Sequence, residues 1–148
     1  MPPTAEPGTR LALSLPARID ILEPCRRAVR DFLAPHGVGP QATYKIELVL
    51  EETLVNIISY AYAEPRGHTI DLSVEVEPAQ VVIVFEDDGV EFDPRAPQHL
   101  GAAPAAAVTI DSAPIGGRGL LLVRKAARLL DYRRAAGRNR LTVSVARN

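Results

Sequence analysis

The sequence predicts a two-layer α/β (α+β) sandwich in which helices cover one face of a mixed, mainly antiparallel sheet. Three observations predict it: amphipathic runs with helical spacing, two pairs of β-rich runs that each close as a hairpin, and no internal repeat. The chain has 148 residues, of which 47% are hydrophobic and 24% charged. These values suit a single domain over residues 1–148 with a substantial core, and a second domain is not expected.

The first half of the chain is predicted to hold one strand and two helices. Residues 1–8 are rich in proline and are expected to be frayed, whereas residues 9–15 alternate as a strand does. A first helix is expected from near residue 17 or 21 to residue 36, with Pro24 tolerated only in its first turn. The second helix is expected from about residue 41 to residue 63, where Glu-Pro-Arg-Gly stops it.

The second half is predicted to hold two hairpins, separated by a long irregular segment and a third helix. Residues 69–77 and 80–87 are β-rich runs joined by Pro-Ala, which predicts an antiparallel hairpin. The stretch 94–116 is rich in proline and alanine and too long for an ordinary connection, so it is expected to be a functional lid or a disordered insert. A third helix is expected after Gly-Gly-Arg-Gly, and residues 130–146 close the chain as a second hairpin.

Composition excludes several classes of function. The net charge of −1 gives no global case for binding nucleic acid or an anionic membrane, and the locally basic residues 124–140 are typical of a solvated helix and hairpin edge. Cys25 is the only cysteine, which excludes an intramolecular disulfide and a cysteine-based metal cluster. The N-terminus lacks the pattern of a signal peptide, and no apolar run reaches about 18 residues. A reducing cytoplasm is therefore the expected location.

The most informative motif lies in the second predicted helix, where Glu52 and Asn56 are four residues apart on one helical face. They lie opposite an apolar stripe, and Leu48 and Val55 flank one edge of their polar strip. This pattern indicates either the lining of a pocket or a solvated face with apolar neighbours. A carboxylate and a carboxamide so arranged can form a site for Mg²⁺ and a nucleotide.

Two further motifs follow at predicted element ends. Asp87 would be the last residue projecting from its strand, where a carboxylate can accept a hydrogen bond from an exocyclic amine such as that of adenine, and Gly89 would let the backbone approach a flat ligand. Asp-Gly is also a favoured turn dipeptide with no ligand at all. Gly117 and Gly119 precede an apolar helix, whose free N–H groups suit phosphate oxygens; the alternative is a flexible helix entry.

In this order, the three motifs resemble those of the histidine-kinase-like (GHKL, Bergerat-fold) ATPases and, within them, the bacterial anti-sigma factor serine kinases. EETLVNIISYAY resembles the N box, DDGVEFDP the G1 box, GGRGLLLV the G2 box and NRLTVSV the last strand. The resemblance covers nearly the whole chain and implies a Bergerat ATP-binding fold in which residues 94–116 are the ATP lid. Two departures stand in or beside the motifs: Tyr60 where the family often has His, and Glu91 where a second glycine is common.

The resemblance also implies a role for each matching residue. Glu52 would be the general base, Asn56 the Mg²⁺ ligand, and Asp87 the residue that binds the adenine amine. The residues expected to bind the cofactor ATP are Asn56, Asp87, Gly89, Phe92, Gly117, Arg118, Gly119, Leu120 and Thr142.

The implied function is an ATP-dependent protein serine/threonine kinase that also binds a sigma factor. Its substrate would be a serine on a STAS-domain anti-anti-sigma protein, and partner switching would decide whether the sigma factor is held; no direct contact with nucleic acid or membrane is expected. An edge strand or the first helix could form a homodimer interface. The alternatives are a nucleotide-sensing module without phosphotransfer and the catalytic domain of a two-component-type regulator. The latter would need a phosphoacceptor histidine, and His36, His68 and His99 are expected to be surface residues.

Overall fold

The structure, a computed structural model, describes residues 9–62, 67–95 and 115–147. In chain order its elements are β1 (Arg10–Pro16), a 3-10 turn (Ile19–Ile21), α1 (Leu22–Leu33), a second 3-10 turn (Ala34–His36), α2 (Pro40–Tyr60), β2 (Thr69–Val76), β3 (Gln80–Asp87), α3 (Ile115–Ala126), β4 (Leu129–Ala135) and β5 (Arg138–Ala146). The predicted frayed N-terminus and residues 96–114 of the predicted lid lie outside the described residues. None of the described helices is long and apolar enough to cross a membrane.

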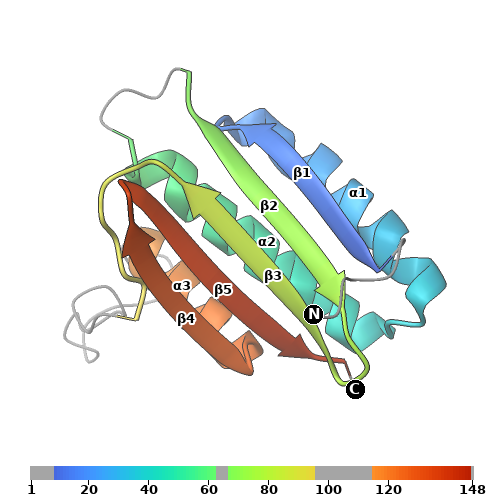
Figure 1. Cartoon of the computed structure of the whole chain (residues 1–148). Helices are drawn as coiled ribbons and strands as arrows, with labels where there is room; N and C mark the ends of the chain where they lie inside the picture. Colours follow the sequence, from blue (N-terminus) through green and yellow to red (C-terminus); the bar gives the residue numbers. More distant parts are fainter. Residues whose placement is uncertain (1–8, 63–66, 96–114, 148) are drawn as a thin grey trace, which may run out of the picture.

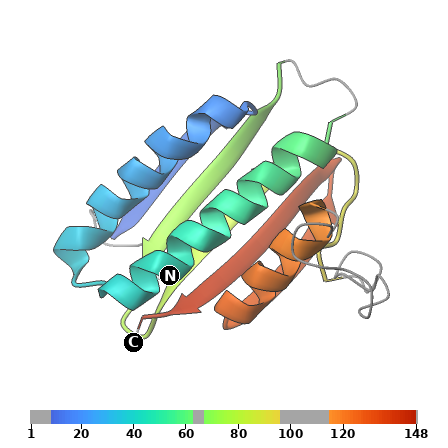
Figure 2. The same cartoon turned by 180° about the vertical axis from the view of Figure 1, so that it is seen from behind.

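The molecule has the two predicted layers, with α1, α2 and α3 side by side on one face of a five-stranded sheet (Figures 1 and 2). The strand order is β1-β2-β3-β5-β4, and all four pairings between the described strands are antiparallel. The prediction of a mixed sheet was therefore wrong in this respect. β4 runs in the same direction as β3, but β5 inserts between them, so that the two parallel strands are never neighbours.

The core lies between the sheet and the helices because apolar residues alternate along each central strand. Strand side chains point to opposite faces in turn, so one face of β2, β3 and β5 is apolar except at Asp87 and Asn139. The fully buried side chains of this layer include Ile70, Val74, Val81, Ile83, Phe85, Val143 and Val145. Ile46, Leu50 and Leu54 of α2 pack against them and are also fully buried, as their helical spacing predicted.

The helix boundaries follow from local signals. Pro24 is the third residue of α1, where a missing N–H costs no intrahelical bond, as predicted. Gly37 has a φ of 71° and ends the second 3-10 turn, and Pro40 begins α2 at the position that proline prefers. Ala61 caps the end of α2, so the helix ends three residues earlier than predicted.

Helix α3 begins earlier than predicted: it starts at Ile115, so Gly117 and Gly119 lie inside its first two turns and not before it. Glycine weakens a helix interior, which led to the prediction of a later start. The first four N–H groups of any helix have no intrahelical partner, however, so glycine near the start forfeits little hydrogen bonding. The last hairpin formed as predicted, and its two-residue turn, Ala136–Gly137, has φ angles of 53° and 75°.

Candidate functional site

A pocket opens where α2, α3 and the ends of β3, β4 and β5 meet. Its lining residues are Thr53, Asn56, Ile57, Tyr60, Ala61, Asp87, Phe92, Pro94, Val123, Leu130, Tyr132, Asn139 and Leu141. Most of these side chains are apolar, and a few polar groups converge among them, which is the usual composition of a small-molecule site. Two of the predicted motifs, in α2 and at the end of β3, therefore face one cavity.

Asn56 and Glu52 take different positions relative to this pocket. Asn56 lines it, so this part of the polar strip of α2 is a pocket wall, one of the two alternatives that the sequence left open. Glu52 is half-buried one helical turn earlier, about 6 Å along the axis, and is not among the lining residues. Tyr60, which replaces the family's histidine, also lines the pocket and is 49% exposed at its mouth.

The Oδ1 atom of Asn56 is buried, and no hydrogen-bond donor of the described residues reaches it. A buried acceptor without a partner is costly unless a ligand or water supplies one. A carboxamide oxygen is a ligand that Mg²⁺ accepts, so this residue fits a metal-binding role. Among the described residues no group of three or more His, Cys, Asp or Glu side chains could hold a metal ion, so a metal here would complete its shell with water and a bound ligand.

Asp87 ends β3 with a carboxylate that is only 4% exposed. Its Oδ1 atom accepts a hydrogen bond from the Gly89 N–H at 2.8 Å and another from the Asn139 Nδ2 at 2.9 Å. Both bonds end on the same oxygen, and no described residue donates to Oδ2. That second oxygen is therefore available to a donor that enters the pocket, as an adenine amine would.

Gly89 is required for a reason that the sequence did not indicate. A Cβ built there would lie 2.5 Å from the Cβ of Ala61, 2.6 Å from its carbonyl oxygen and 2.9 Å from Oδ1 of Asp87. The close approach is thus between the turn and the end of α2, which the Val90 N–H also joins by donating to the Ala61 carbonyl at 2.8 Å. The prediction that Gly89 makes room for a flat ligand is not what this packing shows.

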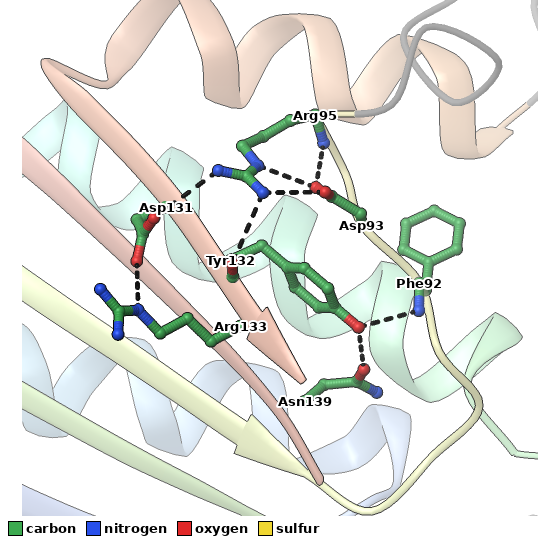
Figure 3. A network of polar contacts seen from close by, with 7 residues as sticks. All are labelled: Phe92, Asp93, Arg95, Asp131, Tyr132, Arg133 and Asn139. Carbon is green, nitrogen blue, oxygen red and sulfur yellow. Dashed lines mark hydrogen bonds and ion pairs between the residues drawn. The ribbon is translucent and has the colours of Figure 1, made fainter. Parts of the chain in front are cut away.

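Sequence reasoning missed Asn139 and Tyr132, which hold the pocket together from β5 and β4. The Tyr132 hydroxyl donates to Oδ1 of Asn139 at 2.5 Å and accepts from the Phe92 N–H at 3.3 Å (Figure 3). Burial raises the pKa of Tyr132, which keeps its proton on the hydroxyl for this bond. The sequence did contain a signal for Asn139, because it shares a strand face with Leu141 and Val143. A polar residue at a core-facing position is costly unless it forms hydrogen bonds, so it indicates a buried polar network.

The segment that leads away from the site is also tied to β4. Arg95 pairs with Asp93 at 2.9 Å and donates to the Tyr132 carbonyl at 3.4 Å, and it lies 3.6 Å from Asp131 (Figure 3). Phe92 and Pro94, between the Asp87 turn and this cluster, line the pocket. The first residues of the predicted lid are therefore anchored to the sheet edge.

The other side of the Asp87 turn is flanked by aromatic rings. Tyr62 stacks on His68 with 4.0 Å between ring centroids, and the His68 Nδ1 lies 3.2 Å from Oδ1 of Asp88. Burial, and then the charges of Asp87 and Asp88, raise the pKa of Tyr62. The turn is thus wedged between this stack and the β4–β5 hairpin.

The structure does not bring Thr142 to the pocket, contrary to its predicted role near adenine. In β5, Leu141 lines the pocket and is followed by Thr142, whose side chain points to the opposite face of the sheet because strand residues alternate. On that face, Thr142 lies opposite Val84 and Asp131 in the neighbouring strands. Placing the last-strand residue from a motif alone was therefore wrong by one position.

The predicted phosphate-binding residues stay a prediction. Residues 117–120 belong to the first turns of α3, but their side chains lie outside the described part of the structure. Val123 of the same helix lines the pocket, so α3 contributes one described residue to its wall. Glu91, the other departure from the family pattern, is exposed beside Val90.

The chain matches the histidine kinase-like ATPase domain family over residues 15–145. It is 33% identical over 101 residues to the serine/threonine-protein kinase BtrW of Bordetella bronchiseptica, and the match covers 68% of each chain. The solved structure of the RsbU and RsbW domains of Rv1364c from Mycobacterium tuberculosis is similar with a TM-score of 0.61 at 17% identity, over 94% of this chain and 33% of that longer one. The SiaB-SiaC complex from Pseudomonas aeruginosa gives a TM-score of 0.60 at 16% identity, over 92% of this chain and 89% of that chain. At such identities the two structures show a common fold.

Proposed function

Because this chain belongs to the histidine kinase-like ATPase domain family, we propose that it binds ATP with Mg²⁺ in the pocket of Asn56 and Asp87 and transfers the γ-phosphoryl group to a serine of a protein partner. One observation carries the proposal: the side chains of Asp87 and Asn56 line the same largely apolar cavity, and the buried Oδ1 of Asn56 has no donor among the described residues. Acceptors for an adenine amine and for a metal ion are thereby combined in one site.

Each residue has a separate duty in this proposal. Asp87 accepts a hydrogen bond from the adenine amine, and apolar side chains such as Ile57 and Leu141 cover the faces of the base. Asn56 is the residue that would hold Mg²⁺, which when bound neutralises phosphate charge. N–H groups in the first turn of α3 would bind phosphate oxygens. As serine oxygen bonds to the γ-phosphorus and the bond to ADP breaks, Glu52 takes the serine proton.

We also propose that the protein partner is a STAS-domain anti-anti-sigma protein and that the chain holds a sigma factor in the cytoplasm, as its sequence motifs suggest. The name of the BtrW relative, a serine/threonine-protein kinase, supports the transfer reaction. The structural similarity to the RsbW-containing and SiaB-containing structures supports the fold on which this reaction would run. A homodimer and the single-domain organisation remain parts of the same proposal.

A phosphotransfer assay with paired variants tests the kinase function. Labelled ATP and candidate STAS proteins are incubated with the wild type, Glu52→Gln and Asp87→Ala. We expect Glu52→Gln to lower transfer by about 10²-fold or more, the usual contribution of a general base, with ATP affinity nearly unchanged. Asp87→Ala should weaken ATP binding itself by about tenfold or more, because it removes a charged hydrogen-bond partner.

Glu51→Gln is the matched control, since Glu51 is the adjacent residue of α2 and lies 3.8 Å from Arg26 of α1. It should change neither quantity. Equal loss of binding and transfer in Glu52→Gln would contradict its role as a base. ATP binding without a phosphoprotein for any partner would instead favour the second candidate, a nucleotide-sensing module, which the position of Glu52 outside the pocket lining suggests.

A further inference from the structure

Asn139 is a buried polar residue among apolar neighbours. It is 5% exposed on the inner face of β5, which it shares with Leu141, Val143 and Val145. A carboxamide in such a place is costly unless its hydrogen-bonding groups are all satisfied. Here they are: Nδ2 donates to Asp87 Oδ1 at 2.9 Å and to the Val90 carbonyl at 2.8 Å. Oδ1 accepts from the Tyr132 hydroxyl and, at 3.1 Å, from Arg134 Nη1.

The partners fix which way this amide faces. An ionised carboxylate such as Asp87 and a carbonyl such as that of Val90 can only accept, so they require the NH₂ group. A guanidinium such as that of Arg134 can only donate, so it requires the oxygen. Turning the amide over would create four mismatched contacts at once, because the Gly89 carbonyl also accepts from Nδ2 at 3.4 Å. The orientation is therefore determined by chemistry at both ends of the side chain.

The same amide holds Asp87 in one orientation. Asp87 Oδ1 is occupied by Asn139 and by the Gly89 N–H, so the carboxylate cannot rotate without losing two bonds in a buried place. Arg134 secures the arrangement further by donating to the Gly89 carbonyl at 2.7 Å. The oxygen left over, Oδ2, is therefore presented to the pocket as a fixed acceptor.

We propose that Asn139 is a positioning residue for base recognition, which makes the site prefer adenine over 6-oxopurines by holding Asp87 as an acceptor. This inference rests on the proposed binding of ATP. Adenine carries an amine at position 6, which donates to a carboxylate, whereas a 6-oxopurine carries a carbonyl there, which repels it. The preference lasts only while the Asp87 carboxylate is held in this orientation, which depends on the NH₂ group of Asn139.

The sharpest test is Asn139→Asp, which keeps the shape of the side chain and replaces two donors by acceptors. Facing a second carboxylate, Asp87 must rotate away or share a proton, and in either case it no longer presents a fixed acceptor. The affinities of ATP and ITP, each with Mg²⁺, are measured by competition against a fluorescent nucleotide, so that no protein substrate is needed. Arg140→Gln is the control, because Arg140 is the next residue of β5, is exposed and points to the opposite face, where it pairs with Glu86.

We expect the wild type and Arg140→Gln to bind ATP at least about tenfold more tightly than ITP, the discrimination that one charged hydrogen bond supplies. In Asn139→Asp the two affinities should agree within about threefold. An unchanged ATP preference in this variant would overturn the inference while leaving the proposed function intact. Failure of the wild type to bind ATP would instead overturn the proposed function, and binding of ATP and ITP with equal affinity would overturn base recognition by Asp87.

A second variant keeps the inference testable if Asn139→Asp does not fold, as judged by its melting curve. Tyr132→Phe removes the hydroxyl that Asn139 Oδ1 accepts from and changes little else in volume. The amide oxygen then keeps only one of its two donors, Arg134, so the amide is held less firmly and the ATP preference should fall by about threefold. A preference equal to that of the wild type would overturn the role of Asn139.

Discussion

At the scale of residues, the pocket of Asn56 and Asp87 depends on the absence of a side chain at position 89. Because a Cβ at this position would lie within 3 Å of both Ala61 and Asp87, Gly89→Ala must push the turn away from α2. We expect a loss of about 1–3 kcal/mol in the free energy of unfolding, typical of overpacking, and a larger relative loss of ATP affinity since Asp87 moves with the turn. Thermal melts and nucleotide titration measure the two effects.

Gly39→Ala is the control for this prediction. Gly39 precedes α2 with a φ of −71°, and a Cβ there would meet nothing within 4 Å. The change should cost less than about 1 kcal/mol and leave ATP affinity unchanged. If Gly89→Ala behaved in the same way, the close packing of the turn against α2 would not matter to the site.

At the scale of residues, the sequence predicted the parts of the site that belong to one local segment. Asn56 and Asp87 were found because each stands out against its own helix or strand. Asn139 was missed because its partner Asp87 is 52 residues away, and only the register of β3 with β5 shows that the two are opposite. Thr142 was misplaced for a related reason, since a motif does not state which face of a strand is buried.

At the scale of elements, the turn between β4 and β5 holds Ala136 in a strained left-handed backbone conformation that a glycine would relieve. Both of its residues have positive φ, which is the type I′ geometry of tight hairpins, but Ala136 pays a steric cost that glycine would not. We expect Ala136→Gly to stabilise the protein by about 1 kcal/mol, which raises Tm by about 2–4 °C in a chain of this length. Differential scanning calorimetry measures the change.

For the neighbouring residue, Ala135, the same substitution is expected to change the melting temperature in the opposite direction. Ala135 is the last residue of β4, and its strand conformation gives glycine no advantage. Ala135→Gly should therefore lower the melting temperature slightly, because glycine loses more backbone entropy on folding. Stabilisation at both positions would show that the positive φ of Ala136 is not the cause.

Element boundaries were predictable where proline or glycine interrupts the chain, and less so elsewhere. Pro24 and the β4–β5 turn were interpreted correctly from local chemistry, and α2 begins at Pro40, one residue before the predicted start. The start of α3 was not, because its three glycines count against a helix unless they lie in its first turns. Sheet direction was also beyond local signals, since it depends on β5 inserting between β3 and β4.

At the scale of the whole molecule, Cys25 reports on global unfolding. It is 2% exposed in the core between α1 and the sheet, and burial raises the pKa of its thiol to about 11. The folded pKa thus exceeds that of the unfolded chain, so the stability linked to this group is intact below about pH 9 and is lost as pH rises toward about 11. We expect a thiol reagent at pH 8 to label the native protein only as fast as it unfolds.

Cys25→Ala separates this titration from that of other groups. The variant should lose stability at pH 7 through the smaller side chain, yet its free energy of unfolding should fall less steeply between about pH 9 and 11 than that of the wild type. Denaturant melts at a series of pH values measure both slopes. Identical slopes would show that the thiol does not gain its raised pKa from the fold.

The insertion of β5 between β3 and β4 has a consequence for folding during synthesis. The ribosome synthesises α2 and β3, which carry Asn56 and Asp87, before β5. Of the described strands, β5 is therefore the last to leave the exit tunnel, and it carries the residues that complete the pocket. Until then β3 has an open edge and Asp87 lacks the amide that orients it. If ATP binds here as proposed, we expect it to stabilise the chain through this site only after β5 has paired with β3.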